Sequence, residues 1–202
     1  MRIIDLGQNS PDWLRWRMAG LGSSDAPVIL HGRHFETTID ILLEEKRALY
    51  HEGKVADRRA NSAMRRGKSR EAAIRHKYES FIGRRAAPAC VVHDTYDFLQ
   101  ASLDGWVDPP GVVVEIKRPG VRRDGTCDHD DALAGHVPEK YRPQLWHQCL
   151  VTGARITHYV SECDRSRYGD RSFTVVPYVP EQKDLDDLLE KEREFWQRVI
   201  MP

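Results

Sequence analysis

The sequence predicts a mixed α/β fold, a single domain over residues 1–202 in which helices flank a central sheet. Forty per cent of the 202 residues are hydrophobic and five are tryptophan, enough for one packed core. Predicted helices come first, then an antiparallel hairpin, then a helix and further strands. No apolar stretch approaches the roughly 20 residues of a membrane helix, and the N-terminus lacks a signal-peptide pattern. We therefore expect a cytoplasmic protein without membrane contact.

The first 83 residues are predicted to be mainly helical. Ser10 before Pro11 is typical of a helix start, and Ser23-Ser24-Asp25 is typical of a second one. Gly83 ends the longest predicted helix. The expected helices cover residues 10–18, 23–30, 38–50 and 59–82. The inward stripe of the last helix is predicted to be Met64, Gly67, Glu71, Ile74, Tyr78 and Phe81.

The second half alternates strands and helices. Asp108-Pro109-Pro110-Gly111 is a strong turn signal between two apolar strands. Residues 120–137 are expected to form a loop. The remaining expected strands and helices cover residues 90–93, 98–107, 112–118, 143–152, 156–163 and 173–179, followed by an amphipathic C-terminal helix.

Net charge is zero, but its distribution is uneven. Residues 54–85 hold eleven Lys or Arg against three acids, whereas residues 181–194 hold seven acids against three bases. A basic run alone is usually a solvated helix face, so it indicates a nucleic-acid surface only if chemistry lies beside it.

The four cysteines include no C-x-x-C pair, and in a cytosolic chain we expect them to be reduced and partly buried. An alternative is a zinc site made of Cys127, His129 and His136, although their spacing is irregular.

The predicted hairpin brings charged side chains together. If residues 108–111 form a four-residue loop, Val107 faces Val112 and Asp104 faces Glu115, with Cβ atoms about 5 Å apart. Lys117 projects from the same face as Glu115. Two facing carboxylates repel each other unless a cation lies between them. Their oxygens suit Mg²⁺ or Mn²⁺, although an E-x-K sequence by itself is more often an exposed acid–base pair.

Glu71 adds a third carboxylate on an apolar helix stripe. A buried, unpaired carboxylate is costly, so Glu71 is expected to lie near a cation.

Five segments together resemble one known family. They are Trp13-x-x-x-Arg17 with Gly22-Ser23-Ser24-Asp25, Gly67-x-x-x-Glu71, Ala101-Ser102-Leu103-Asp104-Gly105, Val114-Glu115-Ile116-Lys117-Arg118-Pro119, and Tyr141-x-x-Gln144-Leu145-x-x-Gln148. In this order they resemble the phage recombination exonucleases of the lambda exonuclease and YqaJ type, a branch of the PD-(D/E)xK nucleases. Leu103 replaces the proline of the general motif. The resemblance spans Trp13 to Gln148 and implies a restriction-endonuclease-like fold.

The resemblance also implies a catalytic set of Glu71, Asp104, Glu115, Lys117 and Gln144. Asp104 and Glu115, with the carbonyl of Ile116, are expected to hold one Mg²⁺, and Asp104 and Glu71 a second. Lys117 is expected to orient or deprotonate the attacking water; deprotonation requires a lowered pKa. Gln144 is expected to hydrogen-bond the water or Lys117, unless it is only a helix-surface residue.

A 5′-phosphate pocket is the second feature that the resemblance implies. Arg17 and Ser24 are expected to form it with the help of Ser102, because a guanidinium and a hydroxyl at a helix N-terminus suit a phosphate. The alternative is that Ser24 only caps a helix and Arg17 is a surface charge. Arg65, Arg66, Lys68 and Arg70 are the candidates for contacts with the DNA backbone.

The resulting expectation is a Mg²⁺-dependent, ATP-independent 5′→3′ exonuclease acting on double-stranded DNA ends. By resemblance it is phage- or prophage-encoded, works with a single-strand-annealing protein and forms a homo-oligomeric ring, often a trimer. Two alternatives stay open: a restriction-like or structure-specific endonuclease, and a non-catalytic DNA-end-binding or protein-binding module.

Overall fold

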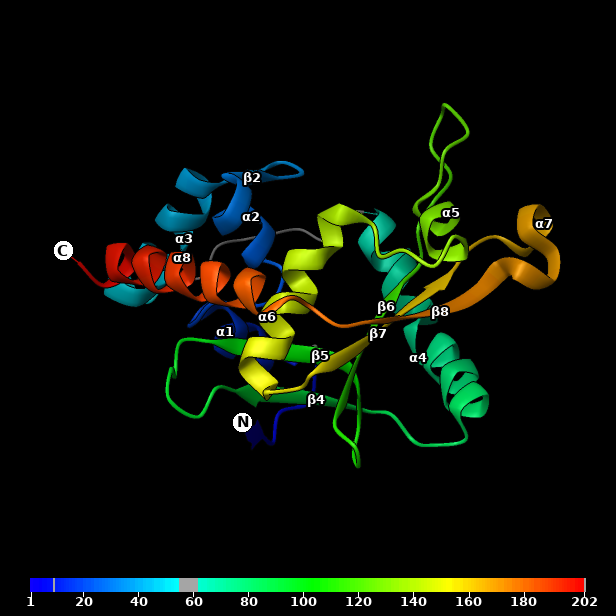
Figure 1. The fold of residues 1–202 in the computed structure, drawn as a ribbon. Coiled ribbons are helices and arrows are strands. Elements are labelled where there is room, and N and C mark those ends of the chain that lie inside the picture. The colour runs from blue at the N-terminus through cyan, green and yellow to red at the C-terminus, as the bar shows by residue number, and fades with distance from the viewer. Residues whose placement is uncertain (9, 55–61, 202) are drawn as a thin grey trace.

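The computed structural model describes residues 1–8, 10–54 and 62–201, and only the backbone of residues 62–69. Its main sheet has six strands in the order β1-β4-β5-β6-β7-β8 (Figure 1). They are β1 (Arg2–Ile4), β4 (Ala87–Val92), β5 (Gln100–Val107), β6 (Val112–Lys117), β7 (Ile156–Glu162) and β8 (Phe173–Tyr178). Strands β6 and β7 run parallel, and the other neighbours are antiparallel. The predicted mixed α/β class is confirmed.

The helices begin and end at capping residues that the sequence predicts. The Ser10 side chain accepts a hydrogen bond from the Trp13 amide and begins α1, whereas Gly153 adopts a φ of 73° and ends α6. The helices are α1 (Pro11–Met18), α2 (Ala26–His31), α3 (Ile39–Glu52), α4 (Ser62–Ile82), α5 (Asp128–Leu133), α6 (Arg142–Thr152), α7 (Arg165–Tyr168) and α8 (Gln182–Ile200), with 3-10 turns η1 (Glu139–Tyr141) and η2 (Gly169–Ser172). None of them is long and apolar enough, within the described ranges, to cross a membrane.

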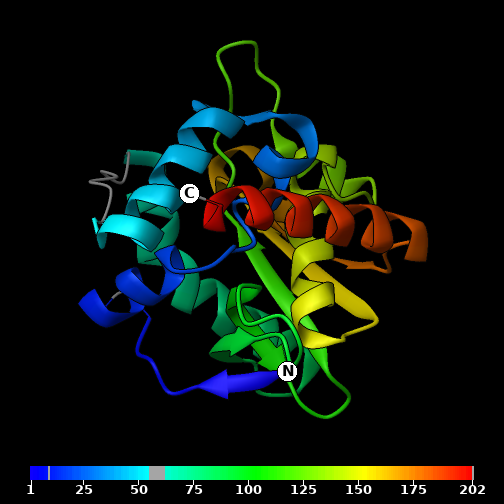
Figure 2. The ribbon, with the colours of Figure 1, turned by 90° about the vertical axis from the view of Figure 1, so that its left-hand side faces the viewer.

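Helices cover both faces of the sheet, and Figure 2 shows the sheet running between α4 and α6. Because side chains alternate along β6, Val113 packs into one core while Val112 and Val114 pack into another. The first core includes Val151 of α6, and the second includes Ile74 and Tyr78 of α4. The two faces of β6 therefore meet different helices, which fixes where each of its polar side chains can lie.

The hairpin register is the predicted one. Val107 pairs with Val112, and Gly105 pairs with Val114, so Asp104 and Glu115 come next along the two strands. Against β4, however, the register of β5 shifts. Ala87 lies opposite Trp106 and Ala89 opposite Leu103, which leaves one extra residue in β5. Such a β-bulge re-aims side chains, and here it lies at Asp104.

Two predictions about elements are wrong. Phe81 is 69% exposed rather than buried, because Tyr78 and Ile82 are the residues that this last part of α4 turns toward the sheet core, while Phe81 meets the Phe173 ring in an edge contact. Residues 120–137 are not one loop, because α5 begins at Asp128 with three aspartates in its first turn, which favours a helix start.

Several short elements were not predicted. They are β1, α7 and a two-stranded hairpin of β2 (Arg33–His34) and β3 (Thr37–Thr38). Each is four residues or fewer, too short for a periodic pattern.

Candidate active site

Glu115 lies at the centre of the polar cluster, on the face of β6 that α6 covers. Its side chain is 2% exposed and accepts hydrogen bonds through both oxygens. Gln144 donates to Oε1 over 2.7 Å, and Gln148 donates to Oε2 over 2.6 Å. Lys117 also donates to Oε1. Two amides one helical turn apart on α6 therefore fix the carboxylate. We expected Gln144 to hydrogen-bond the water or Lys117, but its partner in the structure is Glu115.

Asp104 lies beside Glu115 at the bulge of β5. Its Oδ2 accepts a hydrogen bond from the Ile116 amide over 2.8 Å. Burial raises the pKa of Asp104 well above its usual range, and the negative charges of Glu115 and Glu71 raise it further. Lys117 and the Ile116 amide lower that pKa without offsetting the rise. The other two predicted carboxylates therefore repel the charge of Asp104, and Lys117 does not offset that repulsion.

Lys117 supplies that cation. Burial on its own would lower the pKa of this amine, but the charges of Glu115 and Asp104 outweigh burial and raise it. Its Nζ lies 5.2 Å from the ring centroid of Tyr141, a residue of the predicted C-terminal segment of the site. Proton abstraction would require a lowered pKa, and these two carboxylates act in the opposite direction.

Glu71 reaches the cluster from α4 and is anchored by Arg75. Arg75 Nη1 donates to Glu71 Oε1 over 3.1 Å and to the carbonyl oxygen of Asp104 over 2.8 Å. The guanidinium thus connects the helix carboxylate to the bulged strand. Arg75 is absent from the predicted set, although its position four residues after Glu71 would have indicated the contact.

The donor set fits a hard divalent cation in chemistry. The negative charges of Glu115 and Glu71 raise the pKa of Asp104, and a divalent ion bound by these carboxylate oxygens would offset that repulsion. The Gln148 Oε1 atom is also buried without a hydrogen-bond partner in the described part of the chain. Among the described residues, no three His, Cys, Asp or Glu side chains lie close enough together to coordinate one metal ion. Lys117 and the α6 amides hold Glu115 instead.

The predicted phosphate pocket brings Arg17 and Ser24 together. Arg17 Nη2 donates to Ser24 Oγ over 2.9 Å, and the guanidinium lies 5.2 Å from the Trp13 ring centroid. Trp13 is buried and its Nε1 donates to Ser102 Oγ over 2.8 Å. Trp13 therefore packs within the fold and links α1 to β5. Ser102 precedes Asp104 by two residues, so this cluster borders the carboxylates.

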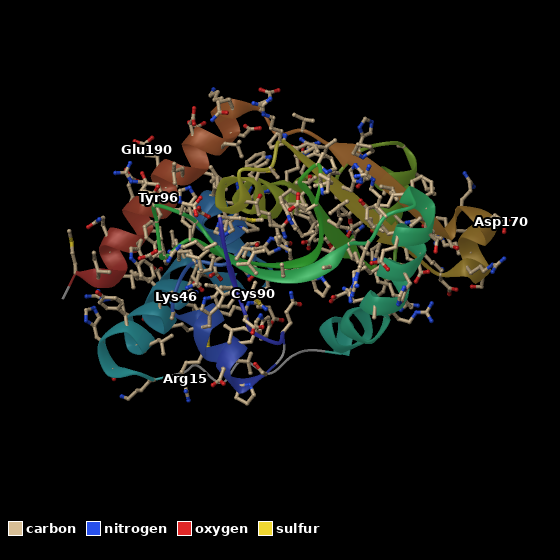
Figure 3. All side chains as sticks on the ribbon, turned by 90° about the horizontal axis from the view of Figure 1, so that it is seen from below. Arg15, Lys46, Cys90, Tyr96, Asp170 and Glu190 are labelled. Carbon is tan, nitrogen blue, oxygen red and sulfur yellow. The ribbon has the colours of Figure 1, made fainter. Side chains whose placement is uncertain are left out.

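A buried ion pair supports the segment that carries Ser24. Lys46 extends from α3 into the molecule (Figure 3) and lies 2.8 Å from Asp25 Oδ2. Its ammonium also donates to the Gly20 carbonyl, while Asp25 accepts from the Gly22 amide over 3.0 Å. Burial alone would raise the pKa of Asp25, but Lys46, the Gly22 amide and Arg17 together lower it. Sequence patterns could not indicate Lys46, which is twenty-one residues from Asp25.

The candidates for contacts with the DNA backbone are only partly described by the structure. The side chains of Arg65, Arg66 and Lys68 lie outside the described ones, whereas Arg70 contacts Glu162 of β7 at 3.4 Å.

The alternative zinc site does not assemble. His129 uses one ring nitrogen toward Ser161 and the other toward the Arg171 carbonyl, both over 2.8 Å, and Cys127 lies 3.5 Å from the sulfur of Cys163. All four cysteines are free and buried.

The fold and the paired carboxylate–lysine hairpin define a restriction-endonuclease-like protein. Residues 12–155 match the model of the YqaJ-like viral recombinase domain, and the chain belongs to that family. A search of curated proteins finds no match.

Solved structures of similar fold include an alkaline exonuclease and a phage-related exonuclease. LHK-Exo of Laribacter hongkongensis, solved alone and with dAMP, has a TM-score of 0.78 at 20% identity, covering 94% of this chain and 92% of its own. A phage-related exonuclease of Haemophilus somnus 129PT has a TM-score of 0.66 at 12% identity, covering 89% and 93%. Family and fold together support a nuclease that acts on DNA.

Proposed function

We propose that the chain is a Mg²⁺-dependent, ATP-independent 5′→3′ exonuclease that digests one strand of linear double-stranded DNA from a 5′-phosphorylated end. The observation that carries the proposal is the placement of two clusters on β5. Ser102 belongs to the Arg17–Ser24–Trp13 cluster, and Asp104, two residues further on, belongs to the carboxylate cluster. An end-specific enzyme needs such a pair, one group for the terminal phosphate and one for the bond to be broken.

The residues that would hold Mg²⁺, or Mn²⁺ in its place, are Asp104, Glu115 and the Ile116 carbonyl, with Glu71 for a second ion. Bound metal would offset negative charge and polarise a phosphoryl oxygen, which favours attack on the phosphorus.

The chain's own groups complete the site. Gln144 and Gln148 hold the Glu115 carboxylate, and Arg75 holds Glu71 against the Asp104 backbone. Lys117, as a cation, orients the attacking water and offsets phosphate charge. Arg17 and Ser24 bind the terminal phosphate through a guanidinium and a hydroxyl.

The test uses duplex DNA labelled at one end, carrying a 5′-phosphate or a 5′-hydroxyl, beside a closed circle. Each substrate is incubated with and without Mg²⁺. We expect Mg²⁺-dependent release of mononucleotides from the phosphorylated end, slower release from the hydroxyl end, and an intact circle. A Glu71→Ala variant is the inactive control.

Other outcomes identify the alternatives. Cleavage of the closed circle would identify an endonuclease with the same carboxylate core. Absence of cleavage on every substrate, with DNA binding retained, would identify a DNA-end-binding protein.

The proposal extends to partners. A viral recombinase domain with this activity exposes single strands, so a single-strand-annealing protein is the expected partner, and a homo-oligomeric ring would keep the DNA from dissociating. Sedimentation of the purified protein measures the oligomer directly.

A further inference from the structure

A second basic site adjoins the carboxylate cluster on the other face of the sheet. It is a cavity of about 560 Å³ at the ends of β6 and β7, beside α4. Four cations and two acids line it: Arg70, Lys77, Arg118 and Arg165 with Glu162 and Asp164. None of Lys77, Arg118 and Arg165 belongs to the predicted DNA-binding set. The surplus of positive charge indicates an anionic ligand.

Glu162 organises this cavity. Its side chain is 4% exposed, and its two oxygens take different cations. Oε2 lies 3.4 Å from Arg70, and Oε1 accepts from Lys77. A buried carboxylate with two partners holds both long side chains at the cavity wall, while about half of each stays exposed. The cations are therefore positioned before a ligand arrives.

Arg118 and Arg165 carry charge that the protein uses little. Arg118 is exposed and makes no ion pair within the described part of the chain. Arg165 lies 3.4 Å from Asp170, but both are largely exposed, and such pairs contribute little. Two guanidinium groups with spare N–H donors suit phosphate oxygens.

The cavity is one residue away from the proposed site of cleavage along three elements. Arg70 precedes Glu71 on α4, and Arg118 follows Lys117 at the end of β6. On β7, Glu162 follows Ser161, the residue paired with Lys117. Since strand side chains alternate, Lys117 lies on the α6 face while Arg118 and Glu162 lie on the α4 face.

We propose that this cavity binds a non-terminal backbone phosphate of the DNA whose end enters the carboxylate site. The inference rests on the proposed function for the identity of the anion as DNA, but it concerns binding rather than cleavage. Backbone contacts of this kind position the duplex independently of its sequence.

The experiment measures binding, without metal, of duplex DNA bearing 5′-hydroxyl ends. EDTA prevents cleavage, and the hydroxyl end removes the contribution of the terminal phosphate. Affinity is measured from about 50 to 200 mM salt, where each phosphate contact contributes a slope of about 0.9 in log affinity against log salt.

Removing a cation and removing the buried carboxylate charge should change DNA affinity in opposite directions. Arg118→Ala and Lys77→Ala should each weaken binding and reduce the slope by about 0.9, whereas Lys77→Arg should retain it. Glu162→Gln removes a negative charge from the cavity and should tighten binding. Arg198→Ala is the matched control, because α8 lies at the opposite end of the molecule from α7 (Figure 1).

Folding and function are separated by design. Lys77→Ala leaves Glu162 with one partner, so thermal melting accompanies every variant; Arg118, which has no such partner, tests the charge alone. Unchanged slopes in Arg118→Ala and Lys77→Ala, or weaker binding in Glu162→Gln, would overturn the inference. Binding of inorganic phosphate that Arg118→Ala abolishes, with no change in the DNA slope of that variant, would also overturn it, since the cavity would then bind free anions rather than DNA. A protein that binds DNA with these slopes but cleaves nothing would refute only the proposed nuclease function.

Discussion

Two aspartates, each with a lysine nearby, behave in opposite ways. Asp25 and Lys46 form a pair that the surrounding amides complete, and the pKa of Asp25 is lowered despite its burial. Asp104 has Lys117 nearby, yet its pKa is raised because burial is joined by the charges of Glu115 and Glu71. The first cluster is balanced by the protein itself and stabilises the fold. In the second cluster Lys117 does not offset the repulsion on Asp104, and a pKa shifted in this way is typical of functional sites.

The largest expected effect is a loss of cleavage caused by a substitution in the Asp104 cluster. Asp104→Asn should reduce cleavage by about 10⁴-fold, the usual size when a member of a catalytic set is removed. Its folding stability should stay equal or rise, because the substitution removes a repelling charge. Nuclease assays and urea denaturation measure the two quantities. Asp25→Asn is the matched control: it should lose stability, since Lys46 is then left unpaired. Full activity in Asp104→Asn would place the site elsewhere.

The next largest effect is a loss of stability caused by a substitution in the Asp25–Lys46 pair. Lys46→Met leaves the Asp25 carboxylate buried without its cation, which should cost about 3–5 kcal/mol of unfolding free energy. The double variant Asp25→Asn with Lys46→Met should recover much of the loss, because no lone charge remains. Equilibrium denaturation of the four proteins measures the coupling. A loss that the double variant does not recover would mean that Lys46 acts through packing.

A smaller effect concerns the segment between the two clusters. Arg17→Ala removes a charged hydrogen-bond donor worth about 1.5–3 kcal/mol, so the preference for 5′-phosphate over 5′-hydroxyl ends should fall by about 10- to 100-fold. Initial rates on the two labelled ends measure that ratio. Arg15→Ala, on the same helix, is the control. An equal loss on both ends would make Arg17 a general DNA contact rather than a phosphate ligand.

The two clusters also differ in how far the sequence predicts them. The hairpin register was predictable because it is local: a turn signal and a period of two place Asp104 against Glu115. The bulge at Asp104 was not, because it depends on pairing with β4, which residues 87–89 provide.

Contacts between distant segments were equally unpredictable. The sequence does not indicate that Gln148 contacts Glu115, because that hydrogen bond depends on how α6 packs over β6. Lys46 lies in a helix whose sequence suggests only an exposed charge, and Glu162 lies ninety-two residues from Arg70. Periodicity shows which face a residue occupies, but only the packed fold shows what that face meets.

The smallest effect distinguishes the clusters by their response to pH in metal-free protein. A carboxyl group whose folded pKa is raised stabilises the fold below its unfolded pKa of about 3.9, and this stability is lost as pH rises through the folded value. Asp104 should therefore make stability fall as pH rises above about 4. Asp25, whose pKa is lowered, should make stability fall as pH drops below about 4. Each proton contributes at most about 1.4 kcal/mol per pH unit.

The measurement is urea denaturation in EDTA from pH 3 to 8, compared between wild type and Asp104→Asn. The comparison isolates the Asp104 contribution from that of other groups, such as His147, whose pKa is raised by Glu192 against the effect of burial. The difference between the two curves should grow with pH. Parallel curves would mean that Asp104 has the same pKa in the folded and the unfolded protein, and the repulsion inferred for its cluster would then be absent.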